Sequence, residues 1–227
     1  MFCGNKMKQA NKILITVLAV FLTFLFGVSI SLSQVTDKDG STYKTIAIGK
    51  QIWLAENLYV SHYRNGDPVP QVQDEKKWEN LSTGAWCYYE NNTENGKIYG
   101  KLYNYYAVVD PRGLAPEGWH MPTDAEWTEL TDFSGGEEIA GGKLKAVALW
   151  QNRNTGATNE SGFSALPGGV RYAGGSFFSI GTSGYFWSAS GNYGRLAWIR
   201  FLSCEDPTVL RSDSGKRNGM SVRCVKD

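Results

Sequence analysis

Residues 116–130 read PEGWHMPTDAEWTEL, and this stretch places the clearest helix in the chain. Thr123 is a good N-cap residue, and Glu126, three positions later, completes a capping box. Trp127 begins the apolar face, and the acidic residues of the first turn favour the positive end of the helix. The pattern predicts a helix that starts after Thr123 and stops at Gly135-Gly136.

Before this helix, the sequence indicates strands. Asp39-Gly40 is a strong hairpin signal, with β-forming residues over 43–48 and a second strand over 51–54. A calcium loop at Asp37 and Asp39 is disfavoured, because the later ligands and the bidentate glutamate are missing at the required spacing.

After the helix, a second short helix is predicted from Glu137 to Val147, with Ile139, Leu144 and Val147 as its inner positions. From Trp150 onward, glycines separate short aromatic pieces, which is typical of long ordered loops. Three β-rich runs end the chain, at residues 197–202, 208–212 and 220–225. Few helices, many short strands and abundant loop predict the α+β class.

The composition is that of a globular protein, with 42% hydrophobic and 20% charged residues and a net charge of +1. Residues 1–34 contain three lysines and no acid, so the remainder has 20 basic and 22 acidic residues, a net charge of −2. A domain whose net charge is so close to zero lacks the extended basic surface that binding to nucleic-acid phosphates requires. We therefore exclude nucleic acid as a partner.

Residues 1–34 have the three parts of a secretory signal peptide. Three lysines precede an apolar run over 13–28, and Ser31 and Ser33 suit a cleavage site after Ser33. The alternative is an uncleaved anchor, since residues 13–32 are long enough to span a bilayer. The early Cys3 lies before the apolar run, so a lipoprotein is not expected. We expect residues 35–227 to form one exported domain, secreted, periplasmic or at the cell surface, that meets the membrane only through its leader before cleavage.

Three cysteines remain in this body, and export favours disulfides. We expect a disulfide between Cys204 and Cys224, which share the C-terminal stretch. Cys87, between two aromatic residues, is expected to be a buried small hydrophobic residue.

The chain resembles the Fibrobacter succinogenes major paralogous domain family over residues 37–227. Six phrases follow one another in the order seen in that family: DKDGSTYKTIAIGKQIWLAENL, YGKLYNYYAV, PEGWHMPTDAEWTEL, GFSALPGG, GYFWSAS and GMSVRCV. Two of them, GWHMPTDAEW and SVRCV, are similar to phrases of the formylglycine-generating-enzyme and C-type-lectin-like superfamily.

This resemblance implies a C-type-lectin-like (sulfatase-modifying-factor-like) fold, with a small twisted antiparallel sheet, two short helices and long ordered loops. It also implies an exported bacterial protein whose biochemical role is undefined. Relatives commonly have a cysteine where Ala115 stands here, so their disulfide pattern does not transfer directly.

The enzymatic alternative is a copper-dependent oxidase related to the formylglycine-generating enzyme, whose chemistry needs two neighbouring thiols. Cys204 has no second cysteine within five residues. His62 is expected in a solvated loop and His120 as a packed imidazole bonded to backbone, and too few ligands gather for zinc. No pattern indicates a nucleophilic serine or a glycosidase pair. We expect no catalysis, no metal and no cofactor.

Binding is the remaining class, and the aromatic loops are its candidate surface. Aromatic rings flanked by Asn and Arg suit sugars, whose C–H faces stack while their hydroxyls form hydrogen bonds. The calcium-binding phrases of C-type lectins are absent, so any glycan binding is expected to be calcium-independent. Trp187 and Trp198 are predicted to belong to the core. The predicted binding residues are Trp150, Tyr172, Asn192, Tyr193 and Arg195.

The leading hypothesis for the function is recognition of a glycan or a protein at the cell surface or in the periplasm. The alternative is a structural or assembly component of the cell surface without a soluble ligand. Burial of Trp150, Tyr172 and Tyr193 would favour that alternative.

Overall fold

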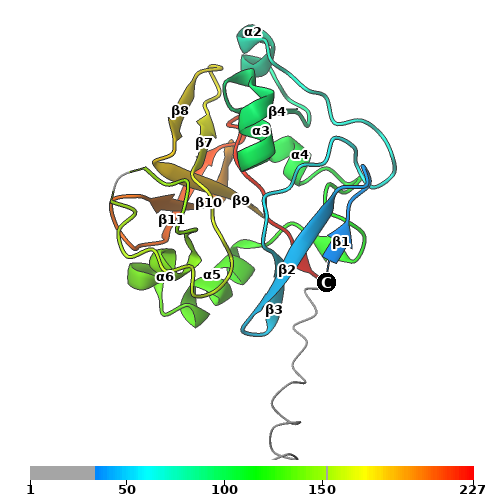
Figure 1. Ribbon diagram of the computed structural model, residues 1–227. Coiled ribbons are helices and arrows are strands. Elements are labelled where there is room, and N and C mark those ends of the chain that lie inside the picture. Colours follow the sequence, from blue (N-terminus) through cyan, green and yellow to red (C-terminus); the bar gives the residue numbers. More distant parts are fainter. Residues whose placement is uncertain (1–33, 152) are drawn as a thin grey trace, which may run out of the picture. The chain divides into compact units, whose positions relative to one another are not determined.

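Two five-stranded sheets organise the protein (Figure 1), whose computed structural model describes residues 34–151 and 153–227. The first sheet has the strand order β1-β2-β3-β12-β6 and is antiparallel. The second has the order β11-β10-β9-β7-β8 and is antiparallel except for the β7–β9 pair. The short strands β4 and β5 pair separately. The strands are β1 (Gln34–Thr36), β2 (Thr42–Ile48), β3 (Gln51–Leu54), β4 (Trp86–Cys87), β5 (Leu102–Tyr103), β6 (Trp119–His120), β7 (Gly168–Arg171), β8 (Phe177–Ile180), β9 (Ser183–Gly191), β10 (Leu196–Ser203), β11 (Leu210–Gly215) and β12 (Val225–Lys226).

The helices are short, and the predicted α+β class is confirmed. Besides the two helices expected after residue 122, residues 34–122 form three single-turn or two-turn helices and one 3-10 turn. None of the helices in the described ranges is long and apolar enough to cross a membrane. The expected leader lies outside the described residues, apart from Gln34 at the start of β1. The helical elements are α2 (Glu75–Glu79), η1 (Tyr89–Asn91), α3 (Thr93–Tyr99), α4 (Tyr105–Val108), α5 (Asp124–Phe133) and α6 (Glu137–Leu144).

The predicted helix after Pro122 is confirmed as α5, with its capping box. The Thr123 hydroxyl accepts a hydrogen bond from the Glu126 amide, and the Glu126 carboxylate accepts from the Thr123 amide at 2.7 Å. Trp127 is fully buried, and its indole N–H donates to the carbonyl of Trp187 in β9 at 3.2 Å. The cap thus starts the helix, and the indole fixes it against the second sheet.

The second predicted helix is shorter than expected, and two of its predicted inner positions are wrong. Helix α6 ends at Leu144, which is buried, whereas Ile139 and Val147 are exposed. The buried face contains Gly141 and Gly142 instead. A Cβ on Gly141 would lie 2.1 Å from the carbonyl oxygen of Thr208, so only glycine permits this backbone contact.

The strand predictions hold at the N-terminal end and in part at the C-terminal end. Gly40 (φ +84°) turns the chain between β1 and β2, and the Asp37 carboxylate accepts from the amides of Asp39 and Ser41 at 2.9 Å. The run predicted over 197–202 is β10, and the next run is shifted to β11. Met220 and Ser221 form only isolated bridges and residues 222–224 form none, so only β12 is regular at the end.

Three hydrophobic clusters form the core, and each contains one thiol. Cys224, Cys204 and Cys87 belong to the first, second and third cluster, and all three are free and buried. The expected Cys204–Cys224 disulfide is therefore wrong, because the fold places the two thiols in different clusters. Cys87 is the buried small residue that was predicted, and burial raises the pKa of its thiol to about 12.

Buried cations hold the irregular segments together. The Arg223 guanidinium donates to the carbonyls of Leu54, Phe163 and Ser164 and to the side chain of Asn57, at 2.6–2.9 Å. Lys145 donates in the same way to the carbonyls of Thr155, Ser203 and Asp206 at 2.8–3.0 Å, and Arg171 donates to three more carbonyls at 2.7–3.0 Å. Backbone carbonyls inside the fold thereby receive hydrogen bonds from buried cations.

Candidate functional site

The turn between β9 and β10 presents three of the five predicted binding residues together. The Asn192 amide donates to the Leu196 carbonyl at 2.9 Å, and the Asn192 side chain donates to Asp213 of β11 at 2.7 Å. Lys216 donates to the carbonyl of Gly194 at 2.8 Å. The turn is thus fixed on both sides, and yet Tyr193 is 90% exposed at its tip.

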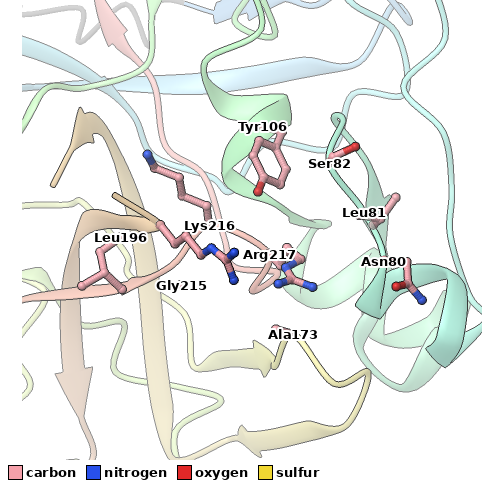
Figure 2. Close-up of a pocket in the computed structure, with 10 residues that line it drawn as sticks. Asn80, Leu81, Ser82, Tyr106, Ala173, Leu196, Gly215, Lys216 and Arg217 are labelled. Carbon is pink, nitrogen blue, oxygen red and sulfur yellow. The ribbon is translucent and has the colours of Figure 1, made fainter. Parts of the chain in front are cut away.

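Arg195, at the end of this turn, lines a pocket of about 430 Å3 (Figure 2). Figure 2 shows the Arg217 guanidinium in the middle of the group, with Tyr106 of α4 on one side and Ala173 of the β7–β8 turn on the other. The volume lies within the usual range for small-ligand sites, about 300–1,000 Å3. The lining residues are Asn80, Leu81, Ser82, Tyr106, Ala173, Arg195, Leu196, Gly215, Lys216 and Arg217.

The walls of the pocket are joined by hydrogen bonds. Asn218, which is almost fully buried, accepts from the Ala173 amide at 2.7 Å and donates to Ser214 of β11 at 2.8 Å. The buried Asn104 caps α4 and donates to the Thr83 carbonyl at 2.8 Å, which holds the segment after α2 beside α4. The pocket is therefore preformed by the scaffold, although it lies between loops.

The charged residues that line the pocket are all positive. Arg195, Lys216 and Arg217 are cationic, and no Asp or Glu lines the pocket. None of the three forms an ion pair within residues 34–151 and 153–227. Lys216 and Arg217 donate instead to backbone carbonyls, of Gly194 and Glu79.

The other predicted aromatic residues lie elsewhere. Trp150 is buried in the second cluster, where its indole N–H donates to the Ala165 carbonyl at 3.0 Å. Trp150 lines a different pocket from that of Arg195, so its assignment to the same binding surface is wrong. Tyr172 is exposed and packs on Phe178 of β8, next to Ala173 of the pocket. Trp187 is buried as predicted, whereas Trp198 is only half-buried.

Trp198 lies instead beneath an exposed ion pair. The Arg211 guanidinium stacks on its ring at 3.4 Å and binds Asp124 of α5 at 2.8 Å. Asp124 also binds Arg200, which is 2% exposed, at 2.7 Å. Burial alone would raise the pKa of Asp124, but the two arginines outweigh it and lower that pKa. This cluster joins the first turn of α5 to β10 and β11.

The two histidines contact carboxylates. His120, expected to bond to backbone, lies between the side chains of Glu126 and Asp227, 2.7 Å from each. Burial lowers its pKa, but these hydrogen bonds outweigh that effect and raise the pKa above its usual value. His62 is half-exposed, as predicted for a solvated loop, and binds Asp39 at 2.6 Å. Neither histidine is part of a group of three or more metal-ligating side chains among the described residues.

A separate pocket of about 530 Å3 borders Cys204, the thiol considered for copper chemistry. Glu205, Arg153 and Trp150 also line this pocket, and no second cysteine of the described part of the chain does. Burial, and then the hydrogen bond to Glu205, raises the pKa of the Cys204 thiol. These surroundings disfavour the thiolate, the form that binds metals and attacks substrates.

The sequence pattern of the Fibrobacter succinogenes major domain matches residues 46–226 of the chain. The chain belongs to this family. No curated protein and no solved structure matches it.

The motifs that resemble the Fibrobacter succinogenes major domain family mostly build the scaffold. In the phrase SVRCV, Arg223 satisfies carbonyls of β3 and of the phrase GFSALPGG, and Val225 pairs with His120 of the phrase GWHMP. Of the pocket residues, only Tyr106 lies inside a motif.

Sequence reasoning missed Tyr106, Lys216 and Arg217. Lys216 and Arg217 stand in the turn GKRNG, which glycines bracket as they bracket the predicted turn GNYGR. That shared bracketing was the one signal that could have found them.

Proposed function

We propose that this chain is an exported, non-catalytic recognition protein of the bacterial cell surface or periplasm. Its ligand, a glycan or a protein, binds across the β9–β10 turn and the neighbouring pocket. One observation supports this proposal above the others: Tyr193 is 90% exposed although its turn is hydrogen-bonded to β11 and to Lys216. A large ring presented in solvent on a hydrogen-bonded turn has no role in packing, and it is available to a ligand.

We propose further that the scaffold is a C-type-lectin-like fold. Support comes from the two phrases on which that resemblance depends, GWHMPTDAEW and SVRCV. They lie side by side, because β6 and β12 pair at His120–Val225 and Trp119–Lys226. A solved structure of the protein that superimposes on a lectin-type domain would test this.

The absence of catalysis is part of the proposal. The oxidase alternative needs two thiols that hold one copper ion. The three described thiols lie in three separate clusters. Copper-dependent oxidation of a cysteine peptide by the purified protein would overturn this part of the proposal.

The test is an array of glycans and of cell-surface proteins, probed with the full chain purified from the envelope of a bacterial host. We expect binding, and we expect Tyr193→Ala and Tyr106→Ala to weaken it about three- to tenfold, as the loss of one stacking ring does. The matched control is Phe133→Ala, which removes an exposed ring from α5, outside the pocket.

Two results would contradict the proposal. Binding that Tyr193→Ala and Tyr106→Ala leave intact would place the ligand elsewhere. The absence of any binding on either array would favour the alternative, a structural or assembly component of the cell surface.

A further inference from the structure

Arg195, Lys216 and Arg217 line one pocket, and none of the three forms an ion pair among the described residues. On the exposed surface, Arg112 binds Asp110 and Asp67, and Arg211 binds Asp124. In the interior, Lys145, Arg171 and Arg223 donate to backbone carbonyls, and Arg200 binds Asp124. The three cations of the pocket differ, because they face an open space about 430 Å3 in volume without an acidic residue in its lining.

Arg195 is the clearest case. Its side chain is exposed, and it forms neither a hydrogen bond nor an ion pair with any residue that the structure describes. All five of its N–H donors are therefore available, in the planar fork that binds a carboxylate or a sulfate with two parallel hydrogen bonds. Lys216 and Arg217 each have one donor bound to a carbonyl, which fixes their charges at the pocket and leaves other donors free.

The charge of the whole domain does not explain this cluster. Residues 35–227 have a net charge of −2, so the pocket is a local positive site on a slightly acidic body. A nucleic-acid surface would require a wider basic footprint. A local cluster of cations without counter-charges is instead suited to a small anion or to a single charged group of a larger ligand.

We propose that the pocket binds an acidic glycan, one whose sugar rings bear carboxylate or sulfate groups. This inference rests on the proposed function and names its ligand class. The anionic group meets Arg195, Lys216 and Arg217, and the hydroxyls meet Asn80 and Ser82. Tyr106 and Tyr193 supply the rings on which sugar C–H faces stack, and they favour a glycan over an acidic peptide.

The experiment measures binding of the full chain to four probes by calorimetry. They are an oligosaccharide of uronic acids, a sulfated oligosaccharide, a neutral oligosaccharide of equal length, and an oligo-glutamate peptide. We expect at least one acidic oligosaccharide to bind more tightly than the neutral one. We expect this affinity to fall as NaCl is raised from about 0.05 to about 0.5 M, because salt screens exposed charges.

The decisive variant is Arg195→Ala, which removes no hydrogen bond or ion pair between residues that the structure describes. We expect it to weaken binding of the acidic probe about tenfold or more, as the loss of a hydrogen bond to a charged group does. We expect Arg195→Lys to restore part of the affinity. The matched control is Lys50→Ala, which removes one exposed charge from the β2–β3 turn and is expected to leave binding unchanged.

The outcomes separate this inference from the proposed function. Equal binding of neutral and acidic oligosaccharides, unaffected by Arg195→Ala, would overturn the inference and leave the recognition function standing. Tighter binding of oligo-glutamate would replace the glycan with an acidic protein. Equal losses in Arg195→Ala and Lys50→Ala would show that only the overall charge matters. If no oligosaccharide or peptide binds and the arrays are also blank, the proposed function fails with it.

Discussion

Replacement of Arg223 by methionine tests the role of the buried cations. The Arg223 guanidinium is fully buried and donates four hydrogen bonds, three of them to backbone carbonyls. Burial lowers the pKa of Arg223 to about 9, so the group remains charged at neutral pH. Methionine fills similar space but cannot donate, and it leaves the acceptors of two separate segments without their partner.

The expected loss in the free energy of unfolding follows from these hydrogen bonds. A hydrogen bond from a charged donor contributes about 1.5–3 kcal/mol, so four contribute about 6–12 kcal/mol before the guanidinium's own desolvation is subtracted. That desolvation costs several kcal/mol. A net loss of about 3–5 kcal/mol is expected, because each buried acceptor left unsatisfied costs about 1–3 kcal/mol. Such a loss is a large fraction of the stability of a typical domain, about 5–15 kcal/mol.

The assay is urea unfolding followed by tryptophan fluorescence, in which the midpoint should fall while the slope stays unchanged. Arg223→Lys retains the charge and reaches fewer acceptors, so it should give an intermediate loss and remain measurable if the methionine variant does not fold. Lys226→Met, an exposed control three residues later, should have little effect. A midpoint for Arg223→Met equal to that of the wild type would refute the reasoning, because the carbonyls would then not need the cation.

Three further outcomes are expected. Asp124→Asn leaves the buried Arg200 without its anion and should lower the free energy of unfolding by about 2–4 kcal/mol in the same assay, more than Asp132→Asn at an exposed position. The pKa of His120 is raised in the folded state. The contribution of His120 to stability is therefore complete below pH 6.5 and is lost as the pH rises through the folded pKa. His120→Gln should abolish this decline in stability between about pH 6 and 8. The window ends there because burial lowers the pKa of Lys101 to about 8, and its titration has the opposite sign. A reducing agent should leave the melting temperature unchanged, since the three described thiols are free; a shift of several degrees would indicate a disulfide.

Features encoded by neighbouring residues could be predicted from the sequence. Helix α5 follows from the capping box of Thr123 and Glu126, and the β1–β2 turn from Asp39-Gly40, because both depend on hydrogen bonds over a few positions. The turn that presents Tyr193 was found for the same reason, since glycines bracket it.

Features set by contacts between distant segments could not be predicted. Gly141 and Gly142 lie on the inner face of α6 because the backbone of residues 207–208 packs against it. The spacing of hydrophobic residues carries no information about that contact. The cysteines 204 and 224 are close in the sequence, but the fold separates them into two clusters. Lys216 and Arg217 resemble every other cation of the chain until the absence of an acidic residue around them is known.

The cations inside the fold also determine where this domain tolerates change. Surface loops usually accept insertions and substitutions. Here Lys145 binds the carbonyl of Thr155 and Arg223 binds those of Phe163 and Ser164, so lengthening the segment between residues 145 and 164 would pull carbonyls away from both cations. At the tip, Lys216 donates to the Gly194 carbonyl, but the Tyr193 side chain is 90% exposed and can be exchanged without loss of that bond. An engineer who wishes to retarget this scaffold should diversify that tip first and leave the segment from 145 to 164 at its present length.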